Sequence, residues 1–295
     1  MVIILLLISQ PLDLERLYNS ATTLLVQFQE EQKASFDSLI ELGQDSVYAD
    51  TTLAYLVEQF DTKSAIERHR LKDIFKAIGP GAISAITMRI DERGKDVEDR
   101  RLKQSLWVLG EIGGDSIVKP VGRFISDSSW SIRSGAFTAL GKSKSSGAHG
   151  LIIQGLDDSI AVVRKSAYYA LSQIASEKDI RFLVQGLDDP YYGVRYAALH
   201  GLVMMDSLAY DALTDIARSS GYNAFYAIKG LCTIGPSSEV WGIGVQNRSE
   251  QVRFLVYSMC EEVAALRGYL EQEDNKILRN CIQRRIGEIE SQVDK

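Results

Sequence analysis

The sequence predicts an all-α protein, an α-solenoid of about seven to eight stacked antiparallel helix pairs. The main observation is a repeat: an apolar residue near the end of a predicted helix recurs at steps of 31 residues, and then at 29, 29 and 26. The members of this column are Ile78, Leu109, Leu140, Leu171, Leu202, Leu231, Cys260 and Ile286. A period near 30 built on helical patterning is typical of stacked helix pairs. The chain also has only 5 Pro, so few positions break a helix.

The first helix of each pair is clearest in residues 132–141, 163–172 and 194–203. Each copy has a β-branched residue followed by Arg, then an Ala three residues and a Leu seven residues after the Arg. These spacings place the apolar residues on one helical face, and the Ala residues allow a neighbouring helix to approach closely. The second helices are predicted after short turns, near 116–126, 147–157, 178–188 and 208–218.

A second pattern marks the turn that leads into each first helix. An Asp or Asn stands six positions before the Arg in four repeats. The pairs are Asp127 with Arg133, Asp158 with Arg164, Asp189 with Arg195, and Asn247 with Arg253. We expect the Asp to accept backbone N–H bonds at the start of the next helix, and the Arg to pair with an Asp of its own or the adjacent repeat. Because the set repeats, we interpret it as structural, since a catalytic constellation is built once.

These residues resemble the HEAT-like repeat family, in particular the short type named after phycobilisome lyases, over roughly residues 66–290. The resemblance implies an interaction fold, used by adaptors, scaffolds, bilin lyases and a few enzymes. It therefore implies no particular reaction. One enzyme of the family is an iron-dependent hydroxylase that holds its metal with His-Glu pairs. This chain has no such pair, so we do not expect that activity.

The N-terminal part of the chain departs from the repeat. Residues 1–11 form an apolar segment, too short to span a bilayer. Two interpretations stay open, the remnant of an export leader or a segment that covers the first helix, and a cytoplasmic location is favoured over export. Residues 12–65 are predicted as a helical cap of degenerate repeats, with helices at 12–33, 34–42 and 47–60. The solenoid then occupies 66–295, with a charged loop at 91–96 and a last helix at 271–285.

Composition and spacing limit the function. The net charge of −6 disfavours a sequence-independent grip on nucleic acid. The three Cys have no metal-ligand spacing, and His69, His149 and His200 fall in different columns of the repeat. No phosphate-binding glycine loop and no nucleophile–base pair can be nominated, so the sequence predicts no enzyme, no cofactor and no metal.

The remaining signals are surface patches that fit contact with another protein. Aromatic and His residues on the outward side of the first helices are expected to form a strip: Trp107, Tyr169, Tyr196, His200 and Phe225. The connecting turns add Trp130 and Tyr192. The second helices are expected to line the concave side, where a basic row is an alternative contact surface: Lys119, Arg123 and Arg181. Either surface is equally the pattern of ordinary packing or of a solvated face.

The sequence thus predicts a non-enzymatic scaffold or adaptor that binds a partner protein on its solenoid surface. An alternative, which depends only on the family resemblance, is a bilin-lyase-like or assembly-chaperone subunit. A third alternative is a nucleic-acid-binding helical-repeat protein, against which the net charge argues.

Overall fold

The structure is a computed structural model, and it describes residues 12–23, 29–91, 100–219 and 221–293. These residues form helices and connecting turns without any strand, so the predicted all-α solenoid is confirmed. The chain divides into two compact units, residues 1–155 (unit 1) and 156–295 (unit 2). The apolar segment 1–11 lies outside the described residues, as does nearly all of the predicted charged loop at 91–96.

Unit 1 contains the cap and the first repeats. Its α-helices are α2 (Leu14–Thr22), α3 (Gln29–Gln44), α4 (Ala49–Glu58), α5 (Ala65–Ile78), α6 (Ile83–Asp91), α7 (Arg100–Ile112), α8 (Val118–Gly122), α9 (Trp130–Lys142) and α10 (His149–Gln154). The predicted helix at 12–33 is wrong in extent, because the first helix ends at Thr22 and α3 runs through the expected break after residue 33. The second helices α8 and α10 are shorter than predicted, since 3-10 turns at Asp115–Ile117 and Ser146–Ala148 precede them.

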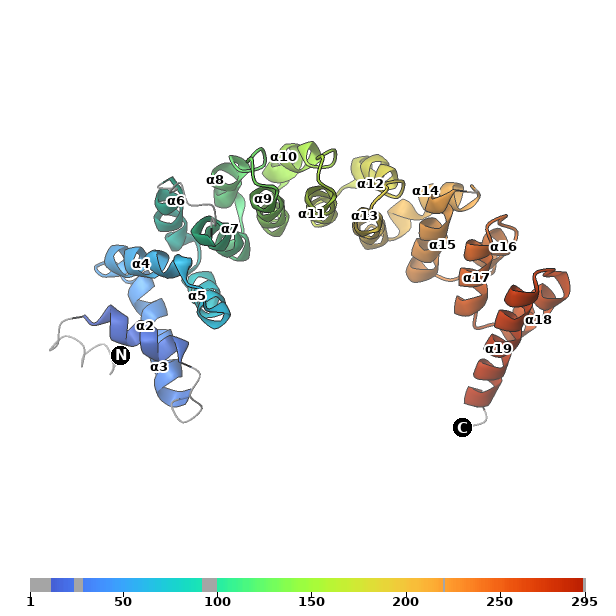
Figure 1. The fold of residues 1–295 in the computed structure, drawn as a ribbon, viewed down its shortest axis with the longest axis horizontal. Coiled ribbons are helices and arrows are strands. Elements are labelled where there is room, and N and C mark those ends of the chain that lie inside the picture. Colours follow the sequence, from blue (N-terminus) through green and yellow to red (C-terminus); the bar gives the residue numbers. More distant parts are fainter. Residues whose placement is uncertain (1–11, 24–28, 92–99, 220, 294–295) are drawn as a thin grey trace. The chain divides into compact units, whose positions relative to one another are not determined.

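Unit 2 consists of helix pairs that follow one another without interruption (Figure 1). Its α-helices are α11 (Ala161–Ser172), α12 (Ile180–Gly186), α13 (Tyr192–Met204), α14 (Ser207–Ala217), α15 (Tyr222–Ile234), α16 (Ser238–Val245), α17 (Glu250–Met259), α18 (Val263–Gln272) and α19 (Lys276–Val293). None of the helices in the described ranges combines the length and apolar character that a membrane span requires.

The helices of unit 2 form two layers. The first helices pack in series, α11 on α13, α13 on α15, α15 on α17 and α17 on α19, and the second helices α12, α14 and α16 do likewise. Within this unit the first helices lie on the inner side of the row (Figure 1). The expectation that second helices line the concave side is therefore wrong here. Small residues in the first helices explain this, because they let that layer pack closely: a Cβ at Gly230 would lie 2.9 Å from Leu199 of the preceding first helix.

The repeat column forms the core, as predicted. Leu140, Leu171 and Leu202 are fully buried, and Cys260 fills the same column as a buried free thiol. The last member, Ile286, is an exception, because it is only half-buried while Ile282, one turn earlier, has no exposed surface. Burying each Leu side chain contributes about 1.5–3 kcal/mol, so this column holds successive repeats together.

Candidate functional site: the first-helix face of unit 2

The turns before α11, α13 and α17 are each closed by an Arg of the helix that follows. The side-chain oxygens of Asp158, Asp189 and Asn247 accept the backbone N–H two residues later, at distances of 2.8, 2.8 and 2.9 Å. Six residues after each of them, an Arg donates from Nη1 to the carbonyl oxygen of that same residue. The distances are 2.8 Å for Arg164, 2.6 Å for Arg195 and 2.9 Å for Arg253. The predicted Asp cap is confirmed, and each turn is stabilised by contacts within seven residues.

Two of these Arg residues also pair with an acid of the following repeat, as predicted. We call such an Arg–carboxylate pair between successive repeats a rung. Arg164 donates from Nε and Nη2 to the two carboxylate oxygens of Asp189, at 2.7 and 3.0 Å. Arg253 reaches Glu273 in the same way, at 2.9 and 3.5 Å. Bidentate pairs of this kind are the strongest and most directional of side-chain hydrogen bonds.

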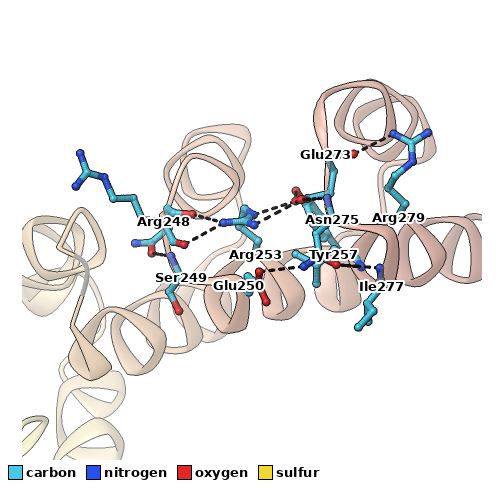
Figure 2. A network of polar contacts seen from close by, with 11 residues as sticks. Arg248, Ser249, Glu250, Arg253, Tyr257, Glu273, Asn275, Ile277 and Arg279 are labelled. Carbon is cyan, nitrogen blue, oxygen red and sulfur yellow. Dashed lines mark hydrogen bonds and ion pairs between the residues drawn. The ribbon is translucent and has the colours of Figure 1, made fainter.

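The rung at Glu273 is the more enclosed of the two. Figure 2 shows Arg253 and Tyr257 converging on the Glu273 carboxylate, to which the Tyr257 hydroxyl donates at 2.8 Å. Burial alone would raise the pKa of Glu273. The hydrogen bonds from Arg253, the Asn275 N–H and Tyr257 outweigh burial and hold the pKa below its ordinary value. This carboxylate is therefore ionised and fully satisfied.

The repeat that contains α15 lacks both halves of the pattern. Helix α15 has no Arg, and Ser219 stands where the other turns have Asp or Asn, two residues before the residue that caps the helix. Asn247 of the next repeat compensates in part, donating from Nδ2 to the carbonyls of Ala217 and Ser219 at 3.0 and 2.8 Å. Arg195 has no carboxylate to pair with: its Nε is buried without a hydrogen-bond partner in the described part of the chain. Its guanidinium instead lies 5.2 Å from the centre of the Tyr226 ring.

A pocket of about 550 Å³ opens at this missing rung. It is lined by Arg195 of α13, by Tyr222, Phe225 and Tyr226 of α15, by Glu250, Gln251, Phe254 and Leu255 of α17, and by Leu278 of α19. Two of the aromatic walls are open to solvent, because Tyr222 is 77% exposed and Phe254 is 44% exposed. Large exposed apolar side chains around a concave site are the composition of a binding pocket.

Aromatic side chains continue from this pocket across the first helices. The Tyr196 ring packs edge-on against Tyr226, 5.5 Å between centres, and Lys229 places its ammonium 4.7 Å from the Tyr196 ring centre. Further along, the Tyr169 ring lies 5.3 Å from His200. Both Tyr rings remain about half exposed, at 48% for Tyr169 and 43% for Tyr196. We call the exposed side of α11, α13, α15 and α17 that carries these residues the first-helix face.

The first-helix face is also electrostatically one-sided. Helices α11, α13 and α15 contain no Asp or Glu at all, and they carry Arg164, Lys165, Arg195 and Lys229. Only Arg164 of these four forms an ion pair among the described residues. The one acid at the pocket is Glu250 of α17, which accepts a hydrogen bond from Asn275 at 2.9 Å. This layer is therefore basic within a chain whose net charge is −6.

The structure distributes the predicted contact residues over both units. In unit 2, Tyr169 and His200 meet each other, Tyr196 and Phe225 both contact Tyr226, and Tyr192 is exposed against Tyr191. Arg181 is exposed on α12, in the second layer, with its guanidinium 4.6 Å from the Phe182 ring centre.

The predicted residues of unit 1 are not gathered on one surface. Trp107 is half-buried and packs edge-on against His69, with ring centres 4.9 Å apart. Trp130 begins α9 and is 50% exposed, and Lys119 and Arg123 are exposed in and just after α8.

Sequence reasoning missed Arg195, Tyr222 and the pocket between them. The signal was present in the repeat itself, because residues 222–234 contain no Arg and the turn before them contains no Asp. A break in a repeated structural pattern marks a position that either has a functional role or has lost its structural one.

Other reactive groups are enclosed. The three Cys are buried, and burial raises the pKa of the Cys232 thiol to about 12, so it stays protonated. Among the described residues no three His, Cys, Asp or Glu side chains gather as a metal site would require.

Comparison with known proteins shows the fold alone. No family model and no curated protein match the chain. It is similar to the crystal structure of YibA from Escherichia coli, with 15% identity over 88% of this chain and 96% of that one and a TM-score of 0.50. It is also similar to the CpcE–CpcF complex of phycocyanin lyase from Nostoc, with 15% identity over 80% and 94% and a TM-score of 0.45. Human deoxyhypusine hydroxylase matches at 16% identity over 88% and 99%, with a TM-score of 0.37.

These likenesses correct one prediction. The sequence indicated that the protein is not an enzyme, and this is wrong as a general conclusion, because two of the similar structures, a phycocyanin lyase and deoxyhypusine hydroxylase, belong to enzymes. The physical reason is that a helical-repeat scaffold carries chemistry in side chains added to its surface, so the fold does not decide between binding and catalysis. The finer assignment to the phycobilisome-lyase type of HEAT-like repeat stays a prediction.

Proposed function

We propose that this protein is a scaffold that binds a partner protein along the first-helix face of unit 2. The observation that carries the proposal is the row of exposed aromatic side chains formed by Tyr169, Tyr196, Tyr222 and Phe254. The first three lie on helices that contain no Asp or Glu. Tyr rings supply a large apolar contact area together with a hydroxyl for hydrogen bonding, and they lose little conformational freedom when covered. Such residues dominate the energy of protein–protein interfaces.

The second layer offers no equivalent. The exposed apolar residue Leu208 lies on α14, which also carries Asp211 and Asp215. Arg181 remains a candidate for a second, weaker contact. In unit 1, Trp130, Lys119 and Arg123 are exposed and remain candidates for a separate contact region.

The proposal is tested by capture from a native lysate with the tagged full chain, read by mass spectrometry. A double variant, Tyr169→Ala with Tyr196→Ala, removes two exposed rings without touching the buried column. The matched control is Leu208→Ala, which removes an equally exposed apolar side chain from the other layer. We expect the intact chain and the control to enrich the same protein, and the double variant to lose it.

A protein that the double variant still captures would place the contact elsewhere, and Arg181→Ala and Trp130→Ala would then be compared. Capture of nothing by the intact chain would count against the proposal. Both rings are expected to be dispensable for folding, so equal thermal transitions of the three proteins by circular dichroism are a required control.

A further inference from the structure

We propose that the pocket beside Arg195 receives an acidic segment of the partner: a carboxylate side chain that pairs with Arg195, next to a large apolar side chain that fills the pocket. In this arrangement the partner supplies the rung that the repeat of α15 lacks. The inference rests on the proposed function, because it assigns the chemistry of the partner at the same face.

Arg195 makes fewer hydrogen bonds than the equivalent Arg residues of the other repeats. In Arg164 and Arg253 the Nε and Nη2 donors both hold a carboxylate. In Arg195 only Nη1 has hydrogen-bond partners, the carbonyls of Asp189 and Pro190. Its Nε is buried and unsatisfied in the described part of the chain, and such orphaned donors are rare in proteins. Arg195 also lines the pocket, and its Nη2 has no hydrogen-bond partner among the described residues and is not among the buried unsatisfied atoms. A carboxylate that enters the pocket therefore approaches the guanidinium at Nη2.

The walls of the pocket are mostly apolar. Apart from Arg195, Glu250 and Gln251, every lining side chain is aromatic or a Leu. Tyr222 and Phe254 stand on opposite helices, α15 and α17, and both are exposed enough to close over a guest. A large aliphatic or aromatic side chain matches these walls, and its burial supplies affinity that the charged contact alone does not.

The charges around the pocket are mostly positive on one side. Lys229 and Lys165 lie on the neighbouring first helices without an ion pair to any described residue, and α11, α13 and α15 carry no acid to oppose a second carboxylate. Glu250 lies on the α17 side. A bound acidic segment therefore extends from the pocket toward α13 and α11, on the side away from the Glu250 carboxylate.

A nucleic acid fits the site less well. A phosphate backbone needs a continuous series of cations, and this face offers three that are not already paired, beside Glu250 and in a chain of net charge −6. Beside the pocket, Tyr196 and Tyr226 meet edge to face, so these two rings form no parallel slot in which a base could stack.

The test begins with selection of a library of random dodecapeptides on the immobilised full chain. We expect the selected peptides to carry Asp or Glu beside a Leu, Phe or Trp. Selection of basic or acid-free peptides, or no enrichment over a blank surface, contradicts the inference. So does tighter binding of a labelled oligothymidylate than of the best acidic peptide at the same ionic strength.

The decisive variant is Ser219→Asp, which places a carboxylate where Asp189 and Asp158 stand in their own turns and so completes the rung internally. It is expected to weaken the selected peptide by about tenfold or more, because Arg195 is then occupied. Ser219→Asn, which adds the same bulk without charge, is expected to leave the affinity unchanged. If Ser219→Asp binds as well as Ser219→Asn, the carboxylate contact does not exist.

The apolar half of the site is tested separately. Phe254→Ala is expected to weaken a selected peptide by about tenfold, and to have little effect on the same peptide once its large apolar residue is replaced by Ala. Equal effects on both peptides would place the apolar side chain elsewhere. If Tyr169→Ala with Tyr196→Ala abolishes partner capture while Ser219→Asp and Phe254→Ala do not affect it, the proposed function holds and this inference fails. If none of these variants affects capture, both fail.

Discussion

Two regions of unit 2 share the same turn but differ in whether the Arg that closes it pairs with an acid of the next repeat. At Arg253 the turn, the Arg and the acid of the next repeat are all present, and the guanidinium is locked between backbone carbonyls and Glu273 (Figure 2). At Arg195 the turn is closed in the same way but the acid is missing, and a pocket with exposed aromatic walls takes its place. The local turn therefore does not depend on the rung. The turn positions the start of the helix, and the Arg donors that would form the rung can bind another group.

The largest expected effect comes from breaking the closed rung. Glu273 is the buried member of this rung, and Glu273→Ala leaves the Arg253 guanidinium and the Tyr257 hydroxyl without their acceptor. Removing one partner of such a pair is expected to lower the free energy of unfolding by about 3–5 kcal/mol. Denaturant unfolding measures this. The neighbouring Asp274→Ala, at an exposed position, serves as control and should change it by less than about 0.5 kcal/mol.

The same rung predicts how the unfolding free energy changes as the pH falls. Because the pKa of Glu273 is lower in the folded protein, the rung stabilises the fold above the ordinary carboxyl pKa of 4.5 and this contribution is lost as pH falls through the folded value. The difference in unfolding free energy between the wild type and Glu273→Gln should therefore be constant near neutral pH and shrink in acid. A difference that grows below pH 4.5 would contradict the assignment.

The rung between Arg164 and Asp189 is expected to have a smaller effect, because Asp189 is more exposed than Glu273, at 10% against 5%, and because Tyr257 adds a further hydrogen bond to Glu273. Asp189→Asn keeps the oxygen that caps the turn at Tyr191 and removes the charge. We expect a loss of about 1–2 kcal/mol in unfolding free energy. The matched change at the open position, Ser219→Asn, should cost almost nothing, and equal losses at the two positions would remove the distinction between closed and open rungs.

The smallest expected effect is a gain. Ser219→Asp gives the Nε of Arg195 an acceptor, so the unfolding free energy should rise by up to about 1 kcal/mol in the absence of any partner. Thermal unfolding of the variant beside Ser219→Asn measures this. A lower transition temperature would mean that the carboxylate cannot reach Arg195 and that the pocket has another origin.

The sequence was sufficient for the features that depend on spacing. The column of Leu140, Leu171 and Leu202 predicted the buried core, and the Asp and Arg six residues apart predicted both the turn and the rungs. Each of these features depends on contacts within one repeat or between the same positions of successive repeats. The sequence period is therefore enough to predict which residues meet.

Features that depend on side-chain packing between particular repeats could not be predicted. Trp107 was expected on an exposed strip, but it packs against His69 of the preceding first helix, a contact that no periodicity encodes. The concave side was misassigned because curvature depends on how closely each layer packs, through residues such as Gly230. The second helices α8, α10 and α12 are shorter than predicted because 3-10 turns replace their first residues, and hydrophobic period does not distinguish the two helix types. The predicted helix at 208–218 agrees with α14 within one residue.

The closed turn has a consequence for how such a chain can change over generations. Each Arg fixes the start of its own helix through carbonyls only five and six residues away. Insertions, deletions or duplications in the preceding second helix therefore leave the next helix start intact, and the period drifts from 31 to 26 residues along this chain without loss of architecture. A single substitution of the acid in one turn is then enough to free the Arg guanidinium of the preceding repeat. A new recognition site can therefore arise in one repeat while the backbone of the fold stays the same.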